Sequence, residues 1–511
     1  MKQTIMKKLH TILSISTILA GGGLLTSLST TSCGNKQPDV DKTLIINNQT
    51  KSTIITYWSS AMDQTSQVEG INLFNLSNNA EIHKFAIDSI INMPIFIPSN
   101  FSCELYGINN GIIDIPTSSS QKGPFSSAIV ISQLKSDDLN NANIKIHDLK
   151  INSSTLSNSL CLDSAFDGNL EIQDNSFNNL NEDSTLQKAN VTNIMFFCEI
   201  HQNASIVIKN NDFFIGSVSA DQSRCIDFYD NVYANLINIE NNLLCSFALL
   251  DSSLIQFDAN ANISQSKIII KNNSGVSNNS QIATAINFKQ GFKSEVDVIN
   301  NIFNTQAGKD SSCVSISSVI VDGKLNVTSN LFNAYSNGNI ASSNAISINA
   351  SNFQNSLSIN MSNNYIASIL QGENSASAHG LTYNVGEDVS NMQCITNNYY
   401  FCRSINTASQ SIPVSFNNEV SFELNGVAYI SAPTTPASNS TNDKINYFNN
   451  MTTVIKKEEV VLDTTTPLIL QIYSSDNDDS KAYISSIMSE ILKDNSILLI
   501  NVLSSDDWQY L

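Results

Sequence analysis

The amino-acid sequence predicts an all-β fold, a parallel β-helix solenoid of about nine to eleven coils with a small α/β cap at its C-terminal end. Three observations lead to this fold class. One short apolar pattern that contains Asn recurs about every 30 residues. A second strand signal precedes most copies. The segments between them are rich in Ser and β-branched residues and show no helical period.

The recurring pattern lies between residues 168 and 400 and reads apolar, any, apolar, two of any, Asn, any, apolar or aromatic. Leu170-Ile172-Asn175-Phe177 is its first copy. A column of Asn, one from each coil, can join neighbouring coils through its amides and tolerates left-handed turns, so we interpret it as a structural ladder. The predicted ladder consists of Asn175, Asn211, Asn242, Asn273, Asn301, Asn330, Asn364 and Asn397, which are separated by 36, 31, 31, 28, 29, 34 and 33 residues.

The second strand signal lies about 10 to 13 residues before most copies, so a coil holds at least two strands. Its members are Leu160-Leu162, Ile226-Phe228, Ile255-Phe257, Ile286-Phe288, Val314-Ile316, Ile346-Ile348 and Leu381-Tyr383. Leucine-rich repeats share the apolar-Asn core, but they run shorter, at roughly 20 to 29 residues, and return through helix-forming segments. Residues 304–323 are Ser-rich and β-branched instead, which favours a parallel β-helix.

The first coils resemble a known group of proteins. Phe96-Ile97-Pro98-Ser99-Asn100, Leu105-Tyr106-Gly107 and the run from Gly111 to Pro116 are similar to the opening coils of pectate-lyase-like right-handed β-helix proteins. The resemblance covers roughly residues 90–420 and implies a right-handed solenoid. It implies no particular activity, because that superfamily includes lyases, hydrolases, phage tailspikes and non-catalytic adhesins.

The N-terminus has the features of an export signal. Lys2, Lys7 and Lys8 precede an apolar stretch of small residues, and Ser32-Cys33-Gly34-Asn35 resembles the lipobox of bacterial lipoproteins, with Thr30 where a Leu is usual. Gly34-Asn35-Lys36 is similar to mature starts in wall-less bacteria. The resemblance implies a signal peptide over residues 1–32, a lipidated Cys33 and attachment to the extracellular face of the cell membrane. The alternative is an ordinary cleaved signal with a free cysteine.

The remaining organisation follows from composition along the chain. We expect a lipidated tether over residues 33–40, an N-terminal cap with the first strands over 41–90, and the β-helix over 91–430. Residues 431–444 read as a polar linker. The small α/β cap spans 445–511, where Tyr483, Ile487 and Ile491 recur at helical spacing.

Composition excludes several partners. The formal net charge of −19 disfavours nucleic acid and anionic surfaces. The two arginines, Arg224 and Arg403, are too few for an acidic polysaccharide site. The eight cysteines besides Cys33 lie mostly in or beside apolar strands, so we interpret them as buried hydrophobes rather than zinc ligands or disulfides. No cofactor and no metal site are predicted, with Ca²⁺ as the one alternative.

The chemistry that the sequence offers is a set of acids that follow the second strand signal. They are Asp163, Asp167, Glu199, Asp227, Asp230 and Asp258, with His201 nearby. Acids on adjacent coils would lie about 5 Å apart, and two coils apart about 10 Å, which brackets the separations found in glycosidases. They also suit a Ca²⁺ site or a solvated acidic face. Tyr229 is the candidate ring beside them, and the motif Ala378-His379-Gly380 lacks the paired aspartates of polygalacturonases.

We therefore expect a membrane-anchored surface lipoprotein that presents its β-helix for binding or adhesion and is not an enzyme. Its expected partners are the membrane, through the lipid anchor, and host or cell-surface glycans or proteins. The alternative is a carbohydrate-active enzyme, a hydrolase or lyase, acting on neutral glycans through the acidic set.

Overall fold

The computed structural model describes much of the chain beyond residue 41. The described residues are 42–59, 64–77, 82–109, 111–115, 126–134, 141–153, 156–181, 190–217, 220–258, 262–338, 341–353, 358–370, 377–385, 393–404, 410–416, 422–431, 468–472 and 498–502. The chain divides into two compact units, Met1–Asp41 and Lys42–Leu511. The predicted signal peptide, Cys33 and the whole predicted tether therefore lie outside the described residues.

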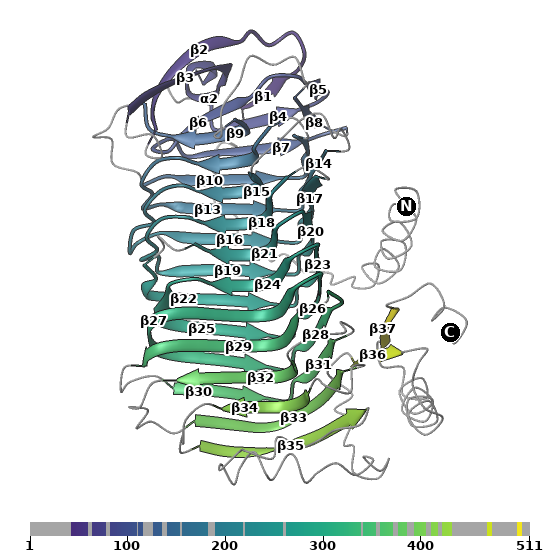
Figure 1. The fold of residues 1–511 in the computed structure, drawn as a ribbon. Coiled ribbons are helices and arrows are strands. Elements are labelled where there is room, and N and C mark those ends of the chain that lie inside the picture. Colours follow the sequence, from purple (N-terminus) through teal and green to yellow (C-terminus); the bar gives the residue numbers. More distant parts are fainter. Residues whose placement is uncertain are drawn as a thin grey trace, which may run out of the picture. The chain divides into compact units, whose positions relative to one another are not determined.

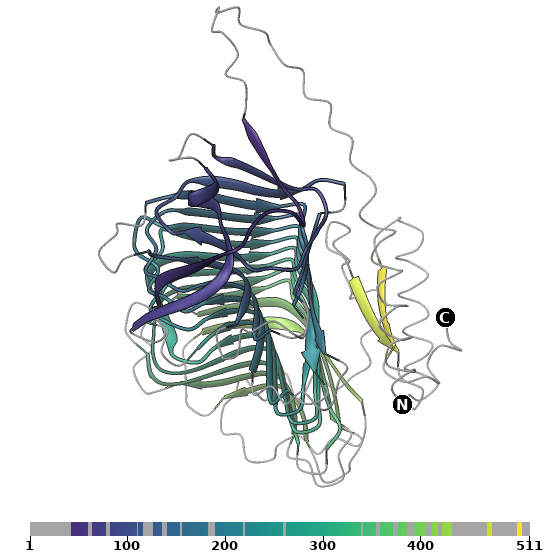
Figure 2. The ribbon, with the colours of Figure 1, turned by 90° about the horizontal axis from the view of Figure 1, so that it is seen from above.

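The second unit contains a parallel β-solenoid, which confirms the predicted fold class (Figure 1). Each full coil carries three strands, and each strand pairs with its counterparts on the coils before and after it. Figure 2 looks along this stack and shows strands of successive coils lying over one another. The sequence predicted at least two strands in each coil, and the structure has three.

The first column holds the apolar pair that precedes each ladder Asn. Its strands are β1 (Thr43–Ile46), β4 (Lys84–Ile87), β7 (Cys103–Gly107), β10 (Asn143–His147), β13 (Asn169–Gln173), β16 (Ser205–Lys209), β19 (Leu236–Glu240), β22 (Ser264–Lys271), β25 (Gly291–Ile299), the end of β27 (Asp310–Thr328), β30 (Ser358–Ser362), and the starts of β33 (Gln393–Ser404) and β35 (Phe422–Ser431).

The second column follows each ladder Asn. Its strands are β5 (Ile90–Ile91), β8 (Ile112–Asp114), β11 (Lys150–Asn152), β14 (Ser176–Asn181), β17 (Asp212–Ser217), β20 (Leu243–Ala248), β23 (Ser274–Asn279), β26 (Ile302–Ala307), β28 (Leu331–Ser336), β31 (Tyr365–Leu370), and the ends of β33 and β35.

The third column carries the second strand signal of the sequence. Its strands are β6 (Ile95–Pro98), β9 (Ser127–Ser132), β12 (Asn158–Leu162), β15 (Asn190–Phe196), β18 (Gln222–Phe228), β21 (Asp251–Phe257), β24 (Ile282–Phe288), the start of β27, β29 (Ser342–Phe353), β32 (Ser377–Val385) and β34 (Gln410–Phe416).

The Asn ladder joins the coils between the first and second columns. Asn301 donates from Nδ2 to the Ile270 carbonyl at 2.8 Å and to Asn330 Oδ1 at 3.0 Å. Its own Oδ1 accepts from the Asn273 backbone N–H and from Asn273 Nδ2, both at 3.0 Å. The same contacts repeat along Asn175, Asn211, Asn242, Asn273, Asn330 and Asn364.

Two details of the predicted ladder are wrong. The last position belongs to Asn398 rather than Asn397, because Ser362 pairs with Thr396 and Asn364 bonds to Asn398 Oδ1 at 3.0 Å. The left-handed backbone conformation also belongs to the residue before each Asn of Asn175 to Asn364, as at Asn300 with φ of 54°. That turn directs the ladder amide inward, where Asn301 is 0 % exposed.

Aliphatic and aromatic side chains fill the interior of the coils. In the third column Phe196, Phe228, Phe257 and Phe288 stack with centroid distances of 4.4, 4.7 and 4.7 Å. In the second column Phe303 stacks on Phe332 with ring centroids 6.2 Å apart. Six cysteines among the described residues are free and buried: Cys103, Cys161, Cys198, Cys225, Cys245 and Cys313.

A hairpin adjoins the first coils. Strands β2 (Thr53–Ser59) and β3 (Gln64–Asn72) pair antiparallel, and a single helical turn, α2 (Leu73–Leu76), follows with Asn72 as its N-cap. Tyr57 packs on Phe96 with ring centroids 5.4 Å apart, and the Trp58 N–H donates to the Gln133 carbonyl at 2.9 Å. The hairpin therefore covers part of the outer face of β6 and β9.

The C-terminal region is described only at β36 (Leu468–Ile472) and β37 (Leu498–Val502), which pair parallel. The linker after Ser431 and the helix predicted around residues 483–492 lie outside the described residues. No described helix is long and apolar enough to cross a membrane.

Candidate functional site

The predicted acids lie at one edge of the solenoid, in and after the third column. We call residues 163–167, 197–203, 229–235 and 258, which follow β12, β15, β18 and β21, the rim. Phe166, Ile200, Val232 and Ile263 form parallel bridges from coil to coil and point into the core. These bridges hold successive turns of the rim in register.

The prediction of acids stacked in a single column is wrong. None of the six occupies the same position as another on an adjacent coil. Asp163 and Asp258 share one row, but Phe197 and Tyr229 stand between them, since each backbone N–H of that row bonds to the coil before it. Asp227 lies within β18, opposite Met195 and Gln256. No two of these carboxyl groups therefore lie at equivalent positions on neighbouring coils, which is the arrangement that was expected to give the 5 Å separation of glycosidases.

The rim acids have polar partners. Asp167 accepts from the Asn203 backbone N–H at 3.1 Å and from Asn203 Nδ2 at 2.9 Å. Glu199 lies 3.4 Å from His201 Nε2 and accepts from Asn231 Nδ2 at 3.4 Å. Asp230 Oδ1 accepts from the Asn231 N–H at 2.7 Å. Asp163 is 2 % exposed, so it does not face solvent.

An aromatic pair lies in the same rim. The rings of Phe197 and Tyr229, on adjacent coils, have centroids 4.8 Å apart at 44° and are both half-buried. The sequence had singled out Tyr229 but missed Phe197. The available signal was that Phe197, like Tyr229, directly follows the last core residue of its third-column strand.

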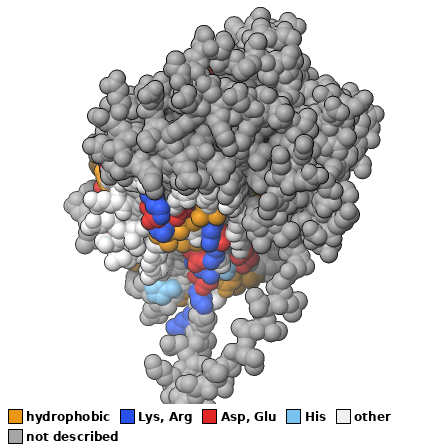
Figure 3. All heavy atoms as spheres, turned by 90° about the horizontal axis from the view of Figure 1, so that it is seen from below, with side chains coloured by type: hydrophobic (Ala, Val, Ile, Leu, Met, Phe, Trp, Pro, Cys, Tyr) orange, Lys and Arg blue, Asp and Glu red, His pale blue; other side chains and the backbone are white. Residues whose placement is uncertain are grey.

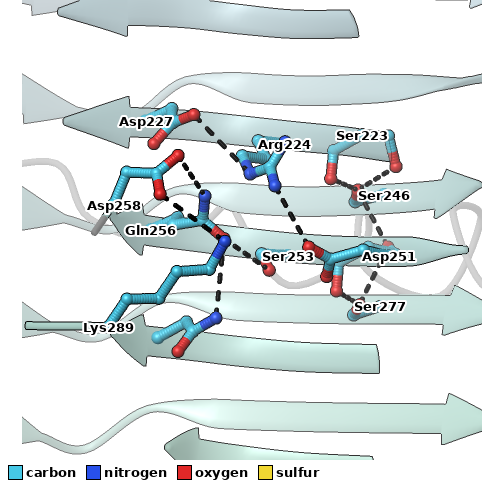
Figure 4. Close-up of polar contacts among 12 residues, drawn as sticks. Ser223, Arg224, Asp227, Ser246, Asp251, Ser253, Gln256, Asp258, Ser277 and Lys289 are labelled. Atoms are coloured by element: carbon cyan, nitrogen blue, oxygen red, sulfur yellow. Dashed lines mark hydrogen bonds and ion pairs between the residues drawn. The ribbon is translucent and has the colours of Figure 1, made fainter. Parts of the chain in front are cut away.

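A buried ion cluster occupies the outer side of the third column (Figure 4). Arg224 Nη2 donates to Asp251 Oδ2 at 3.1 Å, and Arg224 Nε lies 3.6 Å from Asp227 Oδ2. Arg224 and Asp227 are 3 % and 1 % exposed. Arg224 Nε, Asp227 Oδ1 and Asp251 Oδ1 are buried without a hydrogen-bond partner.

The cluster continues toward the next coils. Gln256 Nε2 donates to Asp258 Oδ2 at 3.3 Å, and Lys289 Nζ lies 3.6 Å from Asp258 Oδ1. Burial raises the pKa of Asp227 to about 7, and the Arg224 guanidinium opposes that rise. Asp227 thus exchanges a proton near neutrality, but its side chain is buried where no substrate can reach it.

His379 lies in the same column, further along the solenoid. Its Nδ1 is 2.9 Å from Asn344 Oδ1 and 3.1 Å from the Thr382 hydroxyl. Burial lowers the pKa of His379 to about 4, so the ring is neutral at physiological pH. Its described contacts are neutral groups, unlike the acid-rich motif of polygalacturonases.

The outer face of the first column carries matched charges. Glu171 pairs with Lys209 at 2.7 Å, Glu240 with Lys271 at 3.0 Å, and Glu295 with Lys324 at 3.3 Å. Figure 3 shows basic and acidic side chains side by side on the described surface. Exposed pairs of this kind contribute little to stability, and each pair neutralises its own charges. Across the described residues, no group of three or more His, Cys, Asp or Glu is placed to hold a metal ion.

No protein-family model matches the sequence, and neither a curated protein nor a solved structure matches the chain.

Proposed function

We propose that this protein is a membrane-anchored surface protein that acts by binding through its rim and does not catalyse a reaction. The proposed ligand is a neutral glycan on a host or neighbouring cell. The observation that carries the proposal is the half-buried pair Phe197 and Tyr229, set among the acids and amides of the same turns.

The chemistry of the rim suits a sugar. Aromatic rings offer an apolar face with a negative quadrupole to the C–H groups of a pyranose. Glu199, Asn231 and Asp230 beside them supply carboxylate and amide groups that bond hydroxyls. The acidic surface and the net charge of −19 repel anionic sugars, which leaves neutral glycans as the favoured class.

Burial of Asp227 supports binding over hydrolysis. A glycosidase needs two carboxyl groups facing one substrate, one of them with a raised pKa. Asp227 has the raised pKa, but its side chain is 2 % exposed and lies against Arg224. The carbohydrate-active enzyme of the sequence analysis is therefore the less favoured alternative.

A glycan array probed with the full-length protein in detergent tests the ligand class. We expect neutral glycans to be retained and Tyr229→Ala to weaken binding about tenfold or more, from the lost stacking and apolar contact. Tyr106→Ala is the matched control, because Tyr106 is also half-buried but stacks on His147 in the first column. Equal losses in both variants, or no neutral glycan retained, would contradict the proposal. Release of reducing sugar would favour the enzyme.

The anchor is tested separately. We expect the wild-type protein to enter the detergent phase on phase separation and Cys33→Ser to stay in the aqueous phase, because acyl chains at Cys33 supply the membrane affinity. Retention of the Cys33→Ser protein on membranes would show that the lipid is not the anchor. This result is independent of the glycan array.

A further inference from the structure

The outer face of the second column carries large apolar side chains over several coils, with Asn and Gln side chains between them. Its inward residues, such as Phe213, Leu244, Phe303 and Phe332, fill the core, so the alternate residues point outward. The outward residues Phe214, Leu243, Phe247, Val276, Ile302 and Tyr365 are half-buried. This face differs from the charged outer face of the first column.

Strand β28 marks where this face is most enclosed. Its outward residues Leu331, Asn333 and Tyr335 are 4 %, 3 % and 7 % exposed, although the equivalent residues of β26 are half-buried. Asn333 Nδ2 donates to Asn304 Oδ1 at 3.0 Å, but Asn333 Oδ1 is buried without a partner. A buried acceptor of this kind calls for a donor from another segment.

The C-terminal strands need an apolar surface of their own. β36 reads LILQI and β37 reads LLINV, so four of five residues in each are apolar. Parallel strands with this composition are typically covered on both faces, and the connection between them is usually a helix. The sequence predicts that helix between them, and one helix covers only one face of a two-stranded sheet.

We infer that the C-terminal unit built on β36 and β37 docks on the outer face of the second column around β26 and β28. The solenoid ends at Ser431, in the second column itself. The segment from Ser431 to Leu468 spans up to about 120 Å when extended, so the C-terminal unit can reach both β26 and β28. The unit then covers the apolar flank, supplies a donor to Asn333, and leaves the rim and the first-column face free for a ligand.

Hydrogen exchange of the full-length protein tests the docking. Ile302→Lys places a charge in the proposed contact, and we expect the β36 and β37 amides to exchange at least about tenfold faster. Ile269→Lys is the matched control, since Ile269 is a half-buried outward isoleucine of the first column. It should leave those amides unchanged.

A reciprocal variant guards against a general loss of folding. We expect Leu470→Lys to speed exchange at the β28 amides while the Asn-ladder coils around Asn211 keep their protection. Two results would overturn the inference. One is unchanged β36 and β37 exchange in Ile302→Lys. The other is a wild-type dimer in sedimentation that Ile302→Lys dissociates, which would assign the face to a second copy of the chain.

Discussion

Replacing Asn301 by Leu isolates the contribution of one rung of the Asn ladder. The two side chains are nearly the same shape, but Leu neither donates nor accepts a hydrogen bond. Asn301 lies in the middle of the ladder and is 0 % exposed, so no water replaces the lost contacts. Because the backbone N–H of residue 301 remains, its 2.9 Å bond to Asn330 Oδ1 is expected to persist.

The magnitude follows from the groups that lose a partner. The Asn273 backbone N–H loses the Oδ1 that accepts from it at 3.0 Å, and the Ile270 carbonyl loses the donor at 2.8 Å. At about 1 to 3 kcal/mol for each buried unsatisfied group, the loss is about 2 to 6 kcal/mol. Asn273 Nδ2 keeps the Ile239 and Lys271 carbonyls, so it adds little.

Hydrogen exchange resolved along the chain is the assay. Solenoid stability is close to a sum of nearest-neighbour terms, so we expect amides of residues 270–335 to exchange about 30-fold faster or more, while distant coils stay protected. Asn300→Gly is the control, since Asn300 has φ of 54°, its half-buried side chain bonds only outside the ladder, to Asn272 Oδ1 at 2.8 Å among the described contacts, and Gly adopts that conformation without strain. Unchanged exchange at residues 270–335 in Asn301→Leu would refute the ladder's role in stability.

Two further variants test the register and the aromatic stack. We expect Asn398→Ala to speed proteolysis of the coils around Met361, whose carbonyl accepts from Asn398 Nδ2 at 2.9 Å, whereas Asn397→Ala should not. Equally fast proteolysis of the two variants would favour the register predicted from the sequence, in which Asn397 is the ladder residue. We expect Phe257→Ala, which removes a ring stacked on both Phe228 and Phe288, to cost about 3 to 5 kcal/mol in urea unfolding. Phe214→Ala, at a half-buried outward position, should cost clearly less.

The sequence predicted the features that repeat with strict spacing. The Asn ladder, the first column and most third-column strands each recur at one position per coil, so a period was visible without any structure. Asn398 shows the limit of that method. Tyr399 and Cys394 satisfied the pattern in one register, while backbone pairing of Thr396 with Ser362 selected another. Adjacent Asn residues at 397 and 398 made the two registers equal in sequence.

The ion cluster could not be predicted from the alternation of inward and outward residues along a strand. Cys225 and Ile226 are consecutive, yet both belong to the core, so the two-residue alternation breaks within β18. Arg224 and Asp227, three residues apart, consequently meet on the other side of the strand. The acids were likewise expected in one column because their sequence spacing matched the period. Five of them follow the strand by one to five residues and Asp227 lies within it, so no two adjacent coils carry an acid in the same row.

The titration of Asp227 predicts the direction in which the stability of the ion cluster changes with pH. Its folded pKa is about 7 and its ordinary value is 3.8, so the folded state holds a proton that the unfolded chain has lost between those values. Stability of these coils should therefore fall as pH rises from about 4 to 7, by up to about 4 kcal/mol. Asp227→Asn cannot ionise and should flatten that slope, whereas Asp221→Asn, at an exposed carboxyl, should keep it. Urea unfolding and hydrogen exchange at pH 5 and pH 8 measure the difference. An equal slope in wild type and Asp227→Asn would mean that Asp227 is already ionised in the folded protein and held by Arg224.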